Sequence, residues 1–184
     1  EDQTLFIARF AQVCDQAYED RTKPPKERRV HHLLLLGQGG SGKTHVVQNL
    51  VFVAALFIWP PTHGLHVAAA SNAQAKNIST TKVKARTLHS ACCMRVQKMV
   101  NSLMSAGNKE ALLQQRWEGA MVLIIEEISM VAASLYNMLD WRIMLGRQLG
   151  HDVTQTTYSH VGCAFGRIPI VIHLGDFLQL KPTG

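Results

Sequence analysis

Long hydrophobic runs are missing from this sequence. Its most hydrophobic stretch, Leu50 to Trp59, has ten residues and ends at Pro60-Pro61, whereas an α-helix needs about 20 apolar residues to cross a bilayer. The chain starts with Glu1-Asp2-Gln3 and not with the basic and then apolar residues of a secretory signal peptide. We therefore expect no membrane partner.

Disulfide and zinc-binding patterns are missing as well. The four cysteines include no C-x-x-C pair, a spacing typical of zinc sites, and we expect reduced thiols in or near the core of an intracellular protein. The nine histidines are scattered, so we expect structural roles for them rather than metal binding. The cysteines are Cys14, Cys92, Cys93 and Cys163.

Acidic residues are the minority among the charged ones. The chain has 13 Asp and Glu against 19 Lys and Arg, for a net charge of +6. This excess fits an anionic partner such as nucleic acid, although solubility alone also accounts for it. The apolar fraction of 47% excludes disorder as the main state. A length of 184 residues suits one well-buried core, so we expect a single domain over residues 1–184.

A phosphate-binding loop is the strongest motif that is present. Residues 37–44 match G-x-x-x-x-G-K-[ST], with an apolar run from Val30 to Leu36 before them and an apolar stretch from His45 to Trp59 after them. The motif needs this strand in front and this helix behind. Its backbone N–H groups face inward at the positive end of the helix, which suits a polyphosphate. The alternative is a glycine-rich turn that happens to carry Lys-Thr. The expected nucleotide-binding residues are Gly37, Gln38, Gly39, Gly40, Ser41, Gly42, Lys43 and Thr44.

Two residues of this loop have distinct expected roles. Lys43 would reach the β- and γ-phosphates as a point charge, and the Thr44 hydroxyl would hold Mg²⁺. A second motif supplies the acids that such a site needs. Five apolar residues, Met121 to Ile125, precede Glu126 and Glu127, and they indicate a buried central strand.

The carboxyl end of that strand would bring both acids to the phosphate site. We expect Glu126 to hold the Mg²⁺ shell and Glu127 to orient and deprotonate the attacking water. The alternative is a strand that ends at solvent, with the two acids as its cap.

Strands and helices alternate along the chain, which favours an α/β fold with a parallel sheet flanked by helices. The stretch from His45 to Trp59 is apolar on most faces, so we expect a helix buried against the sheet. The other expected elements are helices over Thr4 to Tyr18, Leu88 to Leu103, Lys109 to Trp117 and Val131 to Gly146, strands over Leu65 to Ala70 and Ile168 to Leu174, and a loop or short hairpin over His151 to Gly166.

Polar residues follow two of these strands. Ser71 comes after the strand that ends at Ala70, and Asp176 and Gln179 come after the last strand. Open α/β sheets bind ligands at the carboxyl ends of their strands. We therefore expect Asp176 and Gln179 on the face that carries Thr44, with Gln179 near the γ-phosphate or the attacking water.

A basic segment lies between Ser71 and the second motif. It indicates either a groove for a nucleic-acid backbone or a solvated surface, and charge alone does not separate the two. Its residues are Lys76, Lys82, Lys84, Arg86, Arg95 and Lys98.

Four ordered motifs resemble the first RecA-like domain of the PIF (petite integration frequency) family of DNA helicases, relatives of RecD in superfamily one. They are residues 37–44, Thr87-Leu88-His89-Ser90, residues 125–130 and residues 175–182, and the resemblance covers nearly the whole chain. It implies a P-loop NTPase that hydrolyses ATP with Mg²⁺ and moves 5′ to 3′ along single-stranded DNA. It also implies roles in DNA repair, recombination and telomere maintenance, in the nucleus or the mitochondrion.

The same resemblance implies roles for single residues. Lys43, Glu127 and Gln179 would be catalytic. Ser71, Thr87 and His89 fall in the family's DNA-contacting segment, and Gln3 corresponds to a glutamine that reads adenine.

Two features depart from the family pattern. Glu126 stands where the family usually has Asp, so we expect Mg²⁺ in an altered water shell. The sequence ends at Gly184, before a second RecA-like domain whose arginine would raise the rate by about 10³- to 10⁵-fold. We expect this chain alone to bind ATP and to hydrolyse it poorly.

Two other classes remain open. One is a non-catalytic nucleotide- or DNA-binding module. The other is a different phosphate-loop enzyme, but a GTPase needs Asn-Lys-x-Asp and Asn108-Lys109 continues with Glu110-Ala111. Small-molecule kinases give no reason for Asp176 and Gln179 after a late strand.

Overall fold

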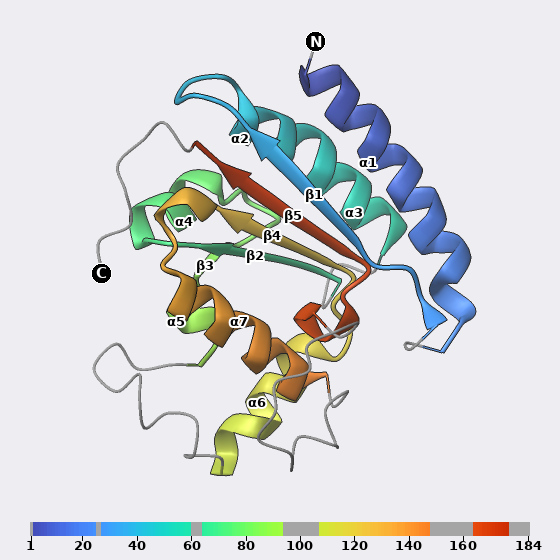
Figure 1. Cartoon of the computed structure of the whole chain (residues 1–184), viewed down its shortest axis with the longest axis vertical. Helices are drawn as coiled ribbons and strands as arrows, with labels where there is room; N and C mark the ends of the chain where they lie inside the picture. Colours follow the sequence, from blue (N-terminus) through green and yellow to red (C-terminus); the bar gives the residue numbers. More distant parts are fainter. Residues whose placement is uncertain (1, 25–26, 60–63, 94–106, 148–163, 177–184) are drawn as a thin grey trace.

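A computed structural model describes residues 2–24, 27–59, 64–93, 107–147 and 164–176. They form one twisted sheet with helices on both faces (Figure 1). The expected α/β fold with a parallel sheet is therefore confirmed. No helix in these ranges is both long enough and apolar enough to cross a membrane.

Five strands make up the sheet, in the order β1-β5-β4-β2-β3, and every paired neighbour is parallel. Leu36 lies opposite Gly175, and Ala69 lies opposite Glu126. The segments that follow β1, β2, β4 and β5 consequently emerge at the same edge of the sheet. The strands are β1 (His31–Leu36), β2 (Leu65–Ala69), β3 (Arg86–Thr87), β4 (Val122–Glu126) and β5 (Ile170–Gly175).

The helices form two layers, and each covers one hydrophobic core (Figure 1). Helix α1 (Asp2–Glu19) packs with the helix that follows the phosphate loop on one face. That second helix runs from α2 (Lys43–Val46) through a π-helical turn (Val47–Val51) into α3 (Phe52–Ile58). The other face carries α5 (Leu88–Ala91), α6 (Gly107–Trp117) and α7 (Ala133–Gly146), while α4 (Asn72–Ile78) follows β2.

One burial prediction is confirmed for one side of its helix and wrong for the other: Val47, Val51 and Phe52 are buried in the core with residues of the sheet, but the outer face is exposed. The α2–α3 helix exposes Leu50 at 43%, Val53 at 60% and Phe57 at 91%. These residues are spaced three and four apart, so they share the face of the helix that points away from the sheet. A single layer of helix over a sheet buries only one side, and apolar composition did not reveal this.

The middle of the chain differs from its prediction as well. The expected helix from Leu88 to Leu103 ends as α5 at Ala91, where Cys93 takes a left-handed φ of 54°, and residues 94–103 lie outside the described residues. Helix α4 and the two-residue strand β3 were not predicted. Only residues 164–166 of the expected loop are described, and they belong to a short 3₁₀ turn, Ala164–Arg167.

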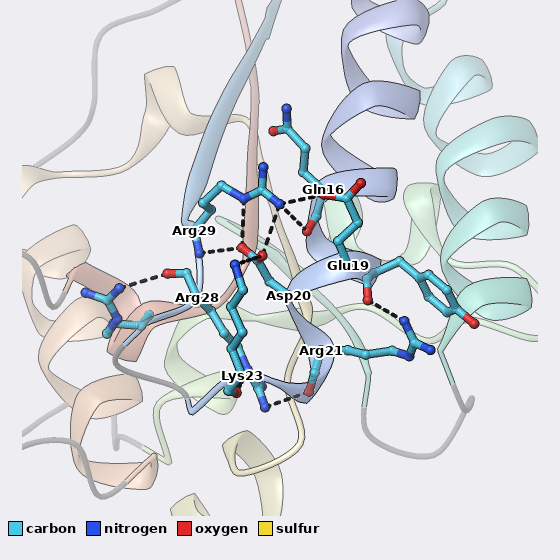
Figure 2. Close-up of polar contacts among 9 residues, drawn as sticks. Gln16, Glu19, Asp20, Arg21, Lys23, Arg28 and Arg29 are labelled. Carbon is cyan, nitrogen blue, oxygen red and sulfur yellow. Dashed lines mark hydrogen bonds and ion pairs between the residues drawn. The ribbon is translucent and has the colours of Figure 1, made fainter.

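A charged cluster joins the end of α1 to the start of β1 (Figure 2). The Asp20 carboxylate is 1% exposed, and it accepts hydrogen bonds from the backbone N–H of Arg29 at 2.9 Å and from its Nε at 2.8 Å. Lys23 Nζ lies 2.8 Å from the same carboxylate. These bonds hold the pKa of Asp20 well below its usual range, chiefly through the Arg29 side chain.

We expect Asp20→Asn to lower the midpoint of denaturant unfolding at pH 7, because Arg29 then loses a charged, bidentate partner. The pKa of Asp20 is depressed in the folded state, so its contribution is present above about pH 4 and fades as the pH falls below that value. The difference between the unfolding midpoints of the wild type and of Asp20→Asn should therefore become smaller at acidic pH. The exposed Asp15→Asn is the control, and an equal loss in both variants would contradict a specific role for the cluster.

Candidate nucleotide-binding site

The phosphate loop lies between β1 and α2, at the edge where the parallel strands end (Figure 1). Gly40 and Gly42 have φ values of 78° and 85°, which favour glycine. A Cβ placed on Gly37 would lie 2.7 Å from the Ser41 Oγ. The backbone conformation thus requires glycine at Gly40 and Gly42, whereas a Cβ on Gly37 would meet only the side chain of Ser41.

Polar groups of the loop converge on one another. Lys43 is 8% exposed, and its Nζ donates to the carbonyl of Gly37 and, at 3.1 Å, to that of Gln38. The backbone N–H of Gly39 donates to Asp176 Oδ2 at 2.9 Å. Asp176 directly follows β5 and is 4% exposed. A cation and an amide donor, the two group types that bind phosphate, are thus collected at one place.

Gln3 comes to this loop from the first turn of α1. Its Nε2 donates to the carbonyl of Ser41, and a Cβ on Gly42 would lie 3.1 Å from the same nitrogen. Helix α1 therefore delivers a residue 38 positions away in sequence to the phosphate loop.

Glu126 ends the central strand β4 and is 5% exposed. Its carboxylate hydrogen-bonds with the Thr44 side chain, while its Oε2 is buried and has no hydrogen-bond partner among the described residues. Burial raises the pKa of Glu126 to about 7, and the neighbouring charge of Glu127 adds to this effect. A buried carboxylate oxygen beside a threonine hydroxyl is a suitable ligand pair for a divalent cation.

Glu127 is half-buried and adopts a left-handed backbone with φ of 56°. For a residue with a Cβ this conformation costs about 1–3 kcal/mol, and such strain gathers at functional sites. Its Oε2 lies 3.5 Å from the hydroxyl of Ser129, and that hydroxyl also accepts from the backbone N–H of Asp176 at 3.4 Å. Ser129 therefore links the ends of β4 and β5.

The residues expected to meet DNA lie at the ends of β2 and β3. Ser71 caps α4 by accepting from the Gln74 N–H at 3.2 Å, and Thr87 caps α5 in the same way. His89 is half-buried in α5. Both hydroxyls thus have a structural role as helix caps, in addition to any ligand contact.

Some of the predicted site residues lie outside the described part of the chain, and the structure also brings to the site contacts that the sequence did not predict. Gln179, Arg95 and Lys98 lie outside the described residues. Sequence reasoning put Asp176 on the correct edge but did not foresee its bond to Gly39, and it gave Ser129 no role. The sequence does contain a signal for the positions of Asp176 and Ser129. Both follow buried parallel strands, and polar residues in such positions meet at the edge of the sheet where ligands bind.

The model of the PIF1-like helicase family matches residues 11–184. The chain belongs to this family. An ATP-dependent DNA helicase, PIF7 of Trypanosoma brucei brucei, is 30% identical over 160 residues, which are 82% of this chain and 13% of that protein.

Solved Pif1 structures share the fold. A Pif1 helicase from Candida albicans matches with a TM-score of 0.60 and 24% identity over 100% of this chain and 34% of its own. A Bacteroides Pif1 bound to single-stranded DNA gives 0.57 and 20%, over 94% of this chain and 33% of its own. A Bacteroides Pif1 in complex with ADP-AlF4 gives 0.54 and 20%, over 92% and 33%. The RecA-like fold is thereby shown, and the chain spans about a third of these relatives' length.

We expect Glu126→Gln to stabilise the nucleotide-free chain by roughly 3 kcal/mol at pH 8, because it removes a buried charge. The pKa of Glu126 is raised from 4.5 to about 7 in the folded state, so the stability of the wild type falls as the pH rises through this window. The difference in the free energy of unfolding between Glu126→Gln and the wild type should grow as the pH rises from 4.5 to about 7 and then level off. Denaturant unfolding in the presence of EDTA measures it.

The matched control is Glu118→Gln, which removes an exposed charge and should change little. Wild type and Glu126→Gln of equal stability across this pH range would show that burial does not perturb the carboxylate.

Proposed function

We propose that this chain is the ATP-binding motor domain of a DNA helicase, which hydrolyses ATP with Mg²⁺ to move 5′ to 3′ along single-stranded DNA and to unwind duplexes. The observation that supports it best is the unsatisfied Glu126 oxygen beside the Thr44 hydroxyl, next to a phosphate loop. Family membership favours the same activity.

The residues present fit ATP and Mg²⁺. The loop offers the Lys43 ammonium for the phosphates, and Thr44 and Glu126 offer two oxygens for the cation. Bound Mg²⁺ would neutralise charge that develops on the phosphates, and it would favour the ionised form of Glu126. In this arrangement Lys43 leaves the carbonyls of Gly37 and Gln38 and turns to the phosphates.

Glu127 is the proposed general base. It follows the metal-binding Glu126 directly, and its left-handed backbone turns the chain sharply at this point. The half-exposed carboxylate accepts the proton of the attacking water, while Ser129 limits its rotation. Gln179 is proposed to sense the γ-phosphate, and Gln3 to contact the adenine from its place on the phosphate loop.

The DNA-contacting surface is proposed at the ends of β2 and β3. Ser71, Thr87 and His89 gather there, and the exposed Lys76 stands on the adjoining α4. A Bacteroides relative has been solved with single-stranded DNA bound, which supports this class of ligand.

A longer protein would complete the motor. We propose that a second RecA-like domain supplies an arginine to the γ-phosphate, since such arginines raise rates by about 10³- to 10⁵-fold. The proposed setting is DNA repair, recombination and telomere maintenance, in the nucleus or the mitochondrion.

ATP turnover by the 184-residue chain, with and without single-stranded DNA, tests the proposal. We expect slow turnover that DNA stimulates, loss of nucleotide binding in Lys43→Ala, and retained binding without turnover in Glu127→Gln, because only the former removes a phosphate ligand.

The exposed Lys76→Ala is the control for loss of a lysine, and it should leave basal turnover without DNA unchanged. ATP binding with no turnover under any condition would favour a non-catalytic nucleotide-binding module. Turnover that survives in Glu127→Gln would contradict its assignment as the base.

A further inference from the structure

A groove of 440 Å³ opens at the edge of the sheet beside the first half of β2. Strand β3 pairs only with Ala68 and Ala69, so among the described residues Leu65 and Val67 have a strand neighbour only on the β4 side. The groove lies between the segment that leads into β3 and helix α6. We call it the β2 groove. Ser71, Thr87 and His89 do not line it, whereas Lys82, Lys84 and Arg86 of the basic segment do.

The walls of the β2 groove come from both helical layers. Val67 and Val83 belong to the core on the α1–α3 side, whereas Trp117 belongs to the core on the α5–α7 side. Leu56 and the half-exposed Leu112 add aliphatic surface on the two sides. The groove is therefore a slot between two layers, with the edge of a strand at its base.

The rim is positively charged. Lys82, Lys84 and Arg86 are exposed and line the groove, and no acidic side chain is among its described lining residues. Arg116 lines it from α6, where its guanidinium is fixed by the carbonyls of Ser90 and Ala91. Among the described residues none of these three exposed cations forms an ion pair with an acidic side chain, so the rim favours an anionic partner.

We propose that the β2 groove binds an extended acidic segment of a partner protein, which adds a parallel or antiparallel strand beside β2. A strand in this slot would lie along the side of β2 that faces away from β4 and place alternate side chains toward the aliphatic walls, with acidic ones at the basic rim. This recognition mode needs a sheet edge, a pocket for alternate residues and opposite charge, and all three are present.

Nucleic acid is the alternative ligand for the β2 groove, and the residues that line the groove disfavour it. Binding of unpaired bases relies on exposed aromatic faces, but Trp117 is 1% exposed and its ring is covered by His66 at a centroid distance of 4.6 Å. The apolar part of the remaining lining is aliphatic and comes from Leu56, Leu65, Val67, Val83 and Leu112. The proposal does not depend on ATP hydrolysis or on DNA translocation.

The test uses a fluorescein-labelled peptide, Glu-Val-Glu-Val-Glu-Val-Glu, and fluorescence anisotropy with the 184-residue chain. We expect saturable binding that weakens by about tenfold in the Lys82→Glu, Lys84→Glu double variant, because two rim charges are reversed. The Lys76→Glu variant reverses the charge of an exposed lysine on α4 that does not line the groove, and it should bind the peptide as tightly as the wild type does. Hydrogen exchange should slow in residues 65–67 when the peptide is bound.

Two controls separate the mode of binding from charge alone. The same peptide with a central proline should bind more weakly, since proline removes a ladder donor, and a lysine-for-glutamate peptide should not bind. No saturable binding, or equal weakening by Lys76→Glu, would overturn the proposal. A fluorescein-labelled oligonucleotide that binds with the same dependence on Lys82 and Lys84, while the peptide does not bind, would assign the groove to nucleic acid.

Discussion

The nucleotide site depends on one buried carboxylate and on the parallel strands that place it. Glu126 ends β4 at the register position opposite Ala69, two strands away from the end of β1. Parallel pairing through β5 brings that end beside the phosphate loop, where Thr44 meets the carboxylate. A slip of one residue in this register would move Glu126 to the other face of the sheet.

Two features of the candidate site lower the stability of the folded chain. Burial makes ionisation of Glu126 unfavourable, and Glu127 holds a left-handed backbone that residues with a Cβ rarely adopt. Strands β4 and β5, buried along their whole length between two apolar cores, offset these costs. The groove beside β2 lies outside these two buried strands, where among the described residues β2 pairs only with β4.

Much of the site could be predicted because its signals are local. The phosphate loop is fixed by glycines that the backbone requires, and the run before Glu126 reads as a buried strand without further context. Because parallel strands end at one edge of the sheet, these two signals together predict that Thr44 and Glu126 lie close to each other.

The features that the sequence did not predict depend on packing between segments that are distant in the chain. The contact of Gln3 with Ser41 follows from how α1 lies on the sheet, 38 residues away in sequence. Strand β3 is too short to leave a periodic pattern. The exposed Phe57 shows that apolar composition does not reveal which side of a helix has a neighbour.

Thr44 and Glu126 are proposed to share one Mg²⁺ with the nucleotide. Equilibrium binding of a non-hydrolysable ATP analogue, with Mg²⁺ or with EDTA, tests this proposal in the wild type and in Glu126→Gln. We expect Mg²⁺ to strengthen binding to the wild type by about tenfold or more and to do so far less in the variant, because the variant lacks the charged ligand. Equal strengthening in both proteins would contradict it.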